Sequence, residues 1–141
     1  MIQGYTIIKA DDAKDVYAGT EVPGEFHPLG KALKTEQLAA TLLRIPPHSD
    51  FEQGTGHSHK EIEELYIITK GILTMRFDDE IIKVSAGSAV RVAPKTLRSH
   101  RNEGDEEVEM WAISRKIDHD DSNFIKVFWK SSPKAKQKRD T

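Results

Sequence analysis

The hydrophobic positions of the chain recur in short runs whose spacing is that of β-strands rather than helices. Apolar, β-branched and aromatic residues cluster or alternate over roughly four to eight positions, and glycine, proline or acidic residues bound the runs. The predicted strands are 39–45, 65–69, 72–77, 81–84, 88–92, 108–114 and 124–129. About eight short strands, with turn signals at intervals of roughly eight to twelve residues, predict an all-β sandwich or barrel.

The boundaries between these runs are set by residues that stop strands. Pro46 closes the first run, because proline cannot donate a ladder hydrogen bond. The acidic stretch 78–80 lies between two predicted strands and indicates the turn of a hairpin. Outside the strands, 10–18 is the one candidate for helix, with an aspartate as the cap of a single turn. The segment 21–30 is expected to be an ordered loop.

Composition places the chain among single-domain globular proteins. It has 141 residues, of which 37% are hydrophobic and 31% charged, and no apolar run approaches the ~20 residues of a membrane helix. Residues 1–10 lack a basic segment followed by an apolar stretch, so we expect no signal peptide. Cysteine is absent. A metal would therefore have to be held by histidine and carboxylate side chains, and we expect a cytoplasmic protein.

Charge is spread unevenly along the chain. The formal net charge of −2 argues against a general nucleic-acid partner, and no feature suggests a membrane partner. The segment 130–141 is basic and almost free of apolar residues, so we expect a disordered tail. Two roles stay open for this tail: a solubilising one and a weak phosphate-binding one. It is also the one direct sign of a purely structural or interaction role.

Two histidines and a glutamate carry the most specific chemical signal. His57 and His59 are two residues apart, so in a strand both imidazoles point to one face. Glu64 stands at the start of the next strand, and a bend over 60–63 would bring it to the same interior. Two imidazoles and a carboxylate suit a divalent first-row metal such as Fe, Mn, Ni, Zn or Cu.

The setting of these residues resembles the cupin superfamily. The positions that match its two conserved motifs are His57, His59, Glu64 and Gly71 for the first, and Gly87, Pro94 and Asn102 for the second. The resemblance covers residues 37–115 and implies a double-stranded β-helix, or jelly-roll barrel, that is usually a homodimer. It divides the chain into N-terminal strands with a loop that leads into the barrel (1–36), the cupin barrel core (37–129) and the basic tail (130–141).

Three positions depart from the family pattern. Phe51 and Lys95 stand where the family has glycines. The second motif of the family also supplies a histidine as the fourth metal ligand, and Arg98 occupies that position here. A guanidinium does not ligate a metal, because it stays protonated at any ordinary pH.

Three interpretations of this fourth position stay open. A local bulge or shift would let His100, which shares a strand face with Arg98, serve as the fourth ligand. Alternatively, Arg98 points inward beside Glu64 and clamps a carboxylate or phosphate of the substrate. In the third interpretation Arg98 forms a buried ion pair with Glu64 and no metal is bound.

These features predict a small stand-alone cupin that binds a divalent metal, a small anionic molecule or both. The alternative is a metal-dependent enzyme of dioxygenase, isomerase or decarboxylase type acting on a small organic acid. In that case His57, His59 and Glu64 hold the metal and Arg98 orients the substrate. Tyr66 shares the inward face of Glu64 and is expected to line the barrel, as a core aromatic or beside the small-molecule ligand.

Overall fold

The structure is a computed structural model that describes residues 4–131, without the side chains of residues 130 and 131. Its strands are β1 (Glu25–Pro28), β2 (Leu38–Ile45), β3 (Gly56–His59), β4 (Glu64–Lys70), β5 (Ile72–Phe77), β6 (Glu80–Ser85), β7 (Ala89–Val92), β8 (Arg98–Arg101), β9 (Val108–Arg115) and β10 (Ser122–Ile125). Its short helical turns are η1 (Ala10–Asp12), α1 (Gly30–Leu33) and α2 (Phe128–Ser131). No described helix is long and apolar enough to cross a membrane.

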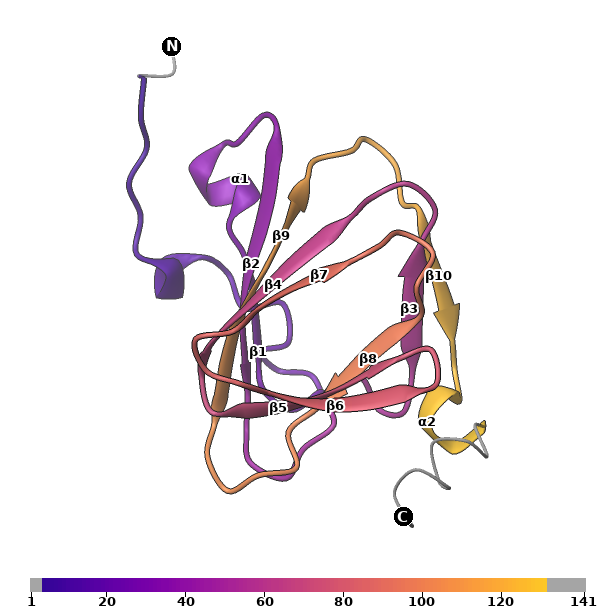
Figure 1. Cartoon of the computed structure of the whole chain (residues 1–141). Helices are drawn as coiled ribbons and strands as arrows, with labels where there is room; N and C mark the ends of the chain where they lie inside the picture. The colour runs from indigo at the N-terminus through magenta and orange to yellow at the C-terminus, as the bar shows by residue number, and fades with distance from the viewer. Residues whose placement is uncertain (1–3, 132–141) are drawn as a thin grey trace.

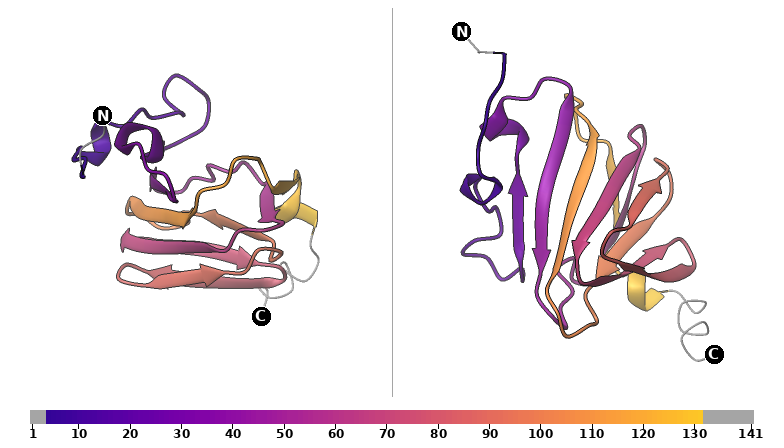
Figure 2. Two further views of the ribbon diagram at one scale, coloured as in Figure 1. Left: turned by 90° about the horizontal axis from the view of Figure 1, so that it is seen from above. Right: turned by 60° about the vertical axis from the view of Figure 1, so that its left-hand side comes forward.

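The strands form two five-stranded antiparallel sheets. One has the order β1-β2-β9-β4-β7, and the other has the order β10-β3-β8-β5-β6. Figure 1 shows the two sheets facing one another around a shared interior, and Figure 2 shows the same arrangement from above and from the side. Consecutive strands such as β3 and β4 lie in different sheets, so the chain crosses repeatedly between the layers. This confirms the predicted all-β jelly-roll barrel.

The core lies between the two sheets, where alternate residues of each strand point inward. On β4, Tyr66 and Ile68 are buried, whereas Leu65 is exposed on the other face. Both sheets contribute to one apolar cluster, which consists of Leu43, Ile45, Phe51, Tyr66, Ile68, Leu73, Met75, Val84, Val92, Val108 and Met110. Burial of this cluster fixes the register of the strands, because a slip of one residue would turn the apolar set outward.

Two of the motif residues have clear structural roles. Gly71 joins β4 to β5 at a φ of +78°, and a Cβ there would lie 2.6 Å from the backbone oxygen of Glu107. A side chain at this position would therefore be strained and would also clash. The buried Asn102 donates its amide hydrogens to the backbone oxygens of Ile45, Pro46 and Glu106, and so ties the loops at one end of the barrel together.

Six of the predicted strands appear with ends within one residue of the predicted ones, and the seventh is wrong in part. Of the segment 124–129, only the first two residues are strand, and α2 begins at Phe128. The reason is tertiary: the N–H of Phe128 donates to Gly54 and its ring lies 3.9 Å below the guanidinium of Arg76. Aromatic and apolar spacing alone could not distinguish this cap from a strand.

Two N-terminal predictions also need correction. The expected loop 21–30 contains β1, which pairs with β2 along its whole length. In the segment 10–18 only η1 is helical, and its cap is Lys9, without a side-chain hydrogen bond. Asp11 lies inside the turn and pairs with Arg44. Most of the predicted basic tail, residues 132–141, lies outside the described residues.

Candidate metal centre

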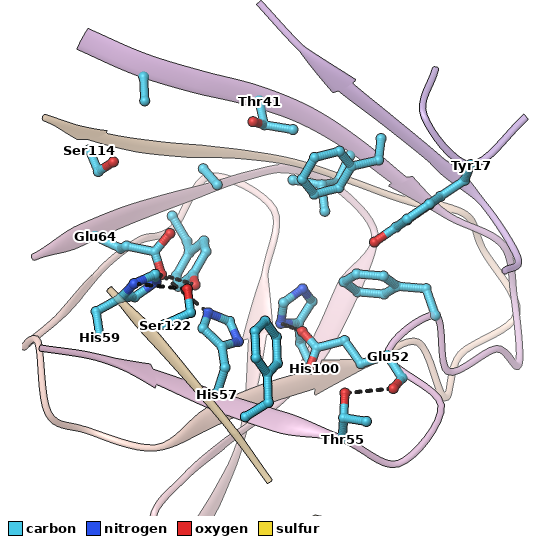
Figure 3. Close-up of a pocket in the computed structure, with 17 residues that line it drawn as sticks. Tyr17, Thr41, Glu52, Thr55, His57, His59, Glu64, His100, Ser114 and Ser122 are labelled. Carbon is cyan, nitrogen blue, oxygen red and sulfur yellow. Dashed lines mark hydrogen bonds and ion pairs between the residues drawn. The ribbon is translucent and has the colours of Figure 1, made fainter. Parts of the chain in front are cut away.

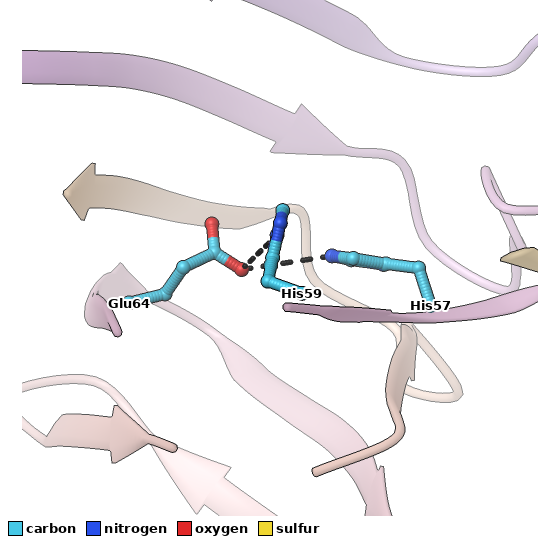
Figure 4. A group of neighbouring side chains, drawn as sticks. All are labelled: His57, His59 and Glu64. Carbon is cyan, nitrogen blue, oxygen red and sulfur yellow. Dashed lines mark ion pairs between the residues drawn. The ribbon is translucent and has the colours of Figure 1, made fainter. Parts of the chain in front are cut away.

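The two histidines and the glutamate meet at the junction of the two sheets. His57 and His59 lie on β3, which pairs with β10 on one side and with β8 on the other. Their side chains share one face of the strand, as the i, i+2 spacing predicts. Glu64 is the first residue of β4, in the opposite sheet. Figure 4 shows the two imidazoles and the carboxylate pointing toward one another.

The three side chains offer ligand atoms within a small volume. One oxygen of Glu64, Oε1, lies 3.2 Å from Nε2 of His59 and 3.5 Å from Nε2 of His57. All three atoms lie within 4.8 Å of one another, and the side chains of all three residues line one cavity. The sequence spacing thus predicted a real juxtaposition.

Asp121 orients His59 from behind and was not found by sequence reasoning. Its Oδ1 lies 2.7 Å from Nδ1 of His59, and its Oδ2 accepts the backbone N–H groups of Glu61 and Ile62. Burial raises the pKa of Asp121, but these hydrogen bonds outweigh it and lower the pKa to about 2. A carboxylate that accepts from Nδ1–H orients the ring so that Nε2 is directed at Glu64.

Glu64 is ionised, because its neighbours supply hydrogens to one oxygen. Tyr66 donates its hydroxyl to Oε1 at 2.7 Å, and Nη2 of Arg98 donates to the same atom at 2.8 Å. Burial opposes ionisation, but His57, Tyr66 and Arg98 together hold the pKa of Glu64 well below its usual range. The hydroxyl of Tyr66 is therefore satisfied within the site, while its ring remains part of the cavity wall.

Arg98 stands behind Glu64 rather than in front of it. Its side chain is 0% exposed and does not line the cavity. Its Nη1 donates to the backbone oxygens of Ala93, Pro94 and Thr96 on the loop before β8. This differs from the expected clamp, because a guanidinium that faces backbone carbonyls and Glu64 does not meet a substrate in the cavity. The ion pair with Glu64, which is one of the two parts of the third interpretation, is present.

His100 lies away from the other two histidines in the site. The group of ligand atoms formed by the described residues contains His57, His59 and Glu64 but not His100. The buried ring of His100 instead places Nδ1 3.0 Å from Oε1 of Glu52. The strand carries no bulge that redirects this side chain, since β8 pairs with β5 in regular register from Arg98 to Arg101. The candidate ligands in this structure are therefore three.

The cavity that these residues share has a volume of about 450 Å³. Figure 3 shows His57, His59 and Glu64 at one side of it and Glu52, Thr55 and His100 at the other. Aromatic and aliphatic side chains form much of the remaining wall, namely Tyr17, Phe26, Leu43, Phe51, Tyr66 and Phe124. Among the described residues that line the cavity there is no lysine or arginine. Its walls alone therefore offer little positive charge to an anion.

The donor set fits a divalent cation. With Nδ1 of His59 directed to Asp121, Nε2 faces the ionised Glu64 oxygen at 3.2 Å. Two lone pairs at this distance repel unless a proton or a metal ion lies between them. Nitrogen and oxygen ligands of this kind suit a first-row metal.

A second acidic cluster lies elsewhere and is already neutralised. Asp11, Glu25 and His27 also bring ligand atoms together. Arg44, however, donates to both carboxylates, at 2.5 Å to Asp11 and at 3.1 Å to Glu25. This cluster is an ion-pair network that ties η1 to β1 and β2.

Comparison with known proteins agrees with the geometry. Residues 41–114 match the family described as cupin domain, and no curated protein matches the chain. A cupin protein from Bacteroides fragilis is 22% identical, with a TM-score of 0.66 over 83% of this chain and 88% of that one. A cupin-superfamily sugar phosphate isomerase from Silicibacter pomeroyi is 18% identical (TM-score 0.64; 79% and 76% covered). The polyketide cyclase RemF from Streptomyces resistomycificus is 12% identical (TM-score 0.69; 93% and 96% covered). At these identities the likeness shows the fold alone.

Proposed function

The chain belongs to the cupin domain family, and we propose that it is a metal-binding member that uses the ion to hold a small organic anion. In this proposal His57, His59 and Glu64 hold the ion at the junction of the sheets. The anion occupies the cavity of about 450 Å³ that these residues line.

One observation carries the proposal: Nε2 of His59 faces an ionised carboxylate oxygen at 3.2 Å, and Nε2 of His57 lies 3.5 Å from the same oxygen. Asp121 fixes this arrangement from the rear, so the imidazole cannot turn its Nδ1–H toward Glu64 instead. Carboxylate–histidine pairs of this type raise the basicity of a metal-ligating imidazole and fix its orientation.

The residues of the chain divide the work of binding. A bound divalent ion supplies the positive charge that attracts an anionic ligand. Arg98, which lies outside the cavity, and Tyr66, whose ring forms part of its wall, hold Glu64 in place and keep it ionised. The aromatic walls exclude water and contact the apolar part of the ligand.

Catalysis by the same site is a second candidate function, and the number of ligands favours it. Three protein ligands that border an open cavity leave positions for a substrate, which is the arrangement of catalytic rather than structural metal sites. The barrel neighbours include proteins named as an isomerase and a cyclase. An acid–base reaction on a small organic acid is the form that this candidate takes.

Metal content tests the proposal directly. The full chain should be purified without chelator or affinity tag, and its metal content measured by elemental analysis beside two variants. We expect about one ion per chain in the native protein and its loss in the double variant His57→Ala, His59→Ala. The matched control His48→Ala, His119→Ala removes two exposed histidines and should keep the ion.

The same measurement separates the remaining interpretations. His100→Ala should keep the ion, because His100 lies outside the ligand group. Binding of benzoate, measured by calorimetry, should disappear when the ion is removed by chelation, because the described cavity wall has no lysine or arginine. Equally low metal content in the native protein and the histidine double variant, before and after addition of Mn²⁺, Ni²⁺ or Zn²⁺, would overturn the proposal.

A further inference from the structure

The end of the cavity away from the histidine pair contains a second glutamate that neither the sequence motifs nor the proposed function uses. Glu52 lies in the loop between β2 and β3, and its side chain is 10% exposed, toward the cavity that it lines. Figure 3 shows it reaching from the side of Thr55 toward His100. Among the described residues no lysine or arginine forms an ion pair with it.

The hydrogen bonds around Ser99 determine where the hydrogen atoms of this end lie. The hydroxyl oxygen of Ser99 is 2.7 Å from each of three partners: Nε1 of Trp129, the backbone oxygen of Thr55, and Oε2 of Glu52. A serine hydroxyl has one hydrogen to donate and two lone pairs. The indole N–H can only donate, so it occupies one lone pair. The carbonyl of Thr55 can only accept, so it takes the one hydrogen of Ser99.

Glu52 must then bring a hydrogen of its own. The remaining lone pair of Ser99 faces Oε2 at 2.7 Å, a normal distance for an O–H···O bond. If Glu52 were ionised, its carboxylate and the carbonyl of Thr55 would compete for one hydrogen, and one contact would become a repulsion between two acceptors. The arrangement is satisfied only when Glu52 carries a proton on Oε2.

The surroundings of Glu52 and His100 favour the uncharged form of both side chains. Burial raises the pKa of Glu52 to about 8, and the negative charges of Asp50 and Glu64 act in the same direction, against the effects of Ser99 and Arg98. Burial also lowers the pKa of His100 to about 3. The imidazole is 3% exposed and packs 4.6 Å from the ring of Phe51. His100 is therefore neutral and does not supply the cation that would ionise Glu52.

We propose that Glu52 is a neutral carboxylic acid, and that it forms with His100 and the neighbouring aromatic rings a second, uncharged binding site for a hydroxyl group of an aromatic ligand. Its proton is committed to Ser99, which leaves Oε1 as a hydrogen-bond acceptor at the cavity wall. Along the same wall, the ring centroid of Tyr17 lies 5.2 Å from that of Phe26 and 6.2 Å from that of Phe51. A neutral acceptor beside aromatic rings suits a phenolic hydroxyl.

Infrared difference spectroscopy tests the protonation state. The spectrum of the native chain minus that of Glu52→Gln, recorded at pH 7 with chelator present, should contain the C=O stretching band of a protonated carboxylic acid. Glutamine keeps a donor toward Ser99 and an acceptor at Oε1, so this variant should fold. The matched control Glu64→Gln should leave the band in place, because Glu64 is ionised. Absence of the band, or its survival in Glu52→Gln, would overturn the proposal.

Binding of phenol tests the ligand class. Phenol carries one uncharged hydroxyl, and toluene has nearly the same shape without it. In calorimetric or thermal-shift titrations, Glu52→Leu should weaken phenol binding by ~10-fold, the effect of one lost hydrogen bond, and should not weaken toluene binding. Glu52→Gln should bind phenol as the native chain does. Failure of the native chain to bind phenol, or equal affinity in Glu52→Leu, contradicts the site.

These results are separable from those on the metal. The infrared band and the phenol titrations are measured with chelator present, so they do not depend on an ion at His57, His59 and Glu64. Loss of metal binding with an intact Glu52 band would overturn the proposed function alone, and the converse would overturn this inference alone.

Discussion

Glu64 and Glu52 line the same cavity, yet different kinds of neighbours surround their carboxyl groups. Around Glu64 the neighbours bring hydrogens: the hydroxyl of Tyr66 and the guanidinium of Arg98 both donate to it. Around Glu52 the neighbours compete for hydrogens, since Ser99 has one to give and the carbonyl of Thr55 already takes it. The first environment stabilises an anion, and the second stabilises an acid.

The comparison shows that residue type does not decide charge inside this barrel. Both carboxyl groups are largely buried, and burial by itself raises both pKa values. The difference comes from the side chains around each carboxyl group: Tyr66 on the same strand and Arg98 on β8 both donate to Glu64, whereas Ser99 has no second hydrogen for Glu52. One cavity thereby gains an end that can hold a cation and an end that is uncharged, and the following changes test that difference.

The largest effect is expected from Arg98→Met. Among the described residues, Arg98 is the one arginine or lysine that forms an ion pair with Glu64. A buried carboxylate left without its partner should cost ~3–5 kcal/mol of the free energy of unfolding, measured in urea with chelator present. The double variant Arg98→Met, Glu64→Gln removes both charges and should regain most of that loss. A single variant as stable as the native chain would show that Glu64 does not need Arg98 to remain ionised.

The pH dependence of stability should differ in kind between the two glutamates. The folded pKa of Glu52, about 8, lies above its ordinary value of 4.5, so the folded chain binds the extra proton between these values. Stability from this group is complete below pH 4.5 and is lost as pH rises to 8, at up to ~1.4 kcal/mol per pH unit. Unfolding of Glu52→Gln, measured at several pH values, should lack this loss.

Glu64 should affect the pH dependence of stability in the opposite direction to Glu52. Its folded pKa lies below the ordinary value, so its contribution is present at neutral pH and is lost only as the solution becomes strongly acidic. Between pH 5 and 8, Glu64→Gln should therefore shift the stability curve without changing its slope. Equal slopes for the native chain and Glu52→Gln in this range would show that the two carboxyl groups do not differ.

A smaller effect is expected at Asp121, which contacts His59 on the side away from Glu64. Asp121→Asn removes the carboxylate that orients His59 and should weaken binding of Zn²⁺ or Mn²⁺ by ~10- to 100-fold, measured by competition with a chelating dye. The control Asp118→Asn changes an exposed aspartate four positions before the start of β10 and should leave the affinity for the metal unchanged. An affinity that does not respond to Asp121 would mean that its bond to His59 has no part in metal binding.

The smallest effect is expected at Trp129, which donates to Ser99 at the uncharged end. Trp129→Phe keeps an aromatic ring beside Arg101 but removes the N–H, and should cost ~1 kcal/mol in chemical unfolding. It should also shift the infrared band assigned to Glu52, because Ser99 is then free to rotate. An unshifted band would indicate that the indole does not fix the orientation of the hydroxyl.

Periodicity and spacing predicted the barrel and the central trio, because these depend on local patterns. Alternation along 65–69 and the two-residue step from His57 to His59 are both visible in a single stretch of chain. The partners of those residues are not local. Asp121 contacts His59 across 62 positions, and it stands among other polar residues with no spacing that distinguishes it.

The fourth position shows the limit of motif reasoning most clearly. Sequence register identified Arg98 as the odd residue but left three roles open. The choice between facing the cavity and facing the protein depends on the backbone oxygens of Ala93, Pro94 and Thr96, which the fold places around the guanidinium. The protonation of Glu52 was equally inaccessible, because it follows from a hydrogen shared among Ser99, Thr55 and Trp129.

The family match ends at residue 114. Two side chains beyond it support the two ends of the cavity: Asp121 contacts His59, and Trp129 contacts Ser99. Asp121 and Trp129 both belong to the C-terminal segment that runs along β3 and closes with α2. This segment therefore supports both ends of the cavity from outside the region of the family match. Replacing the stretch after residue 115 with that of a relative would change the support of His59 and of Ser99 together, and would leave the sequence of β1 to β9 unaltered.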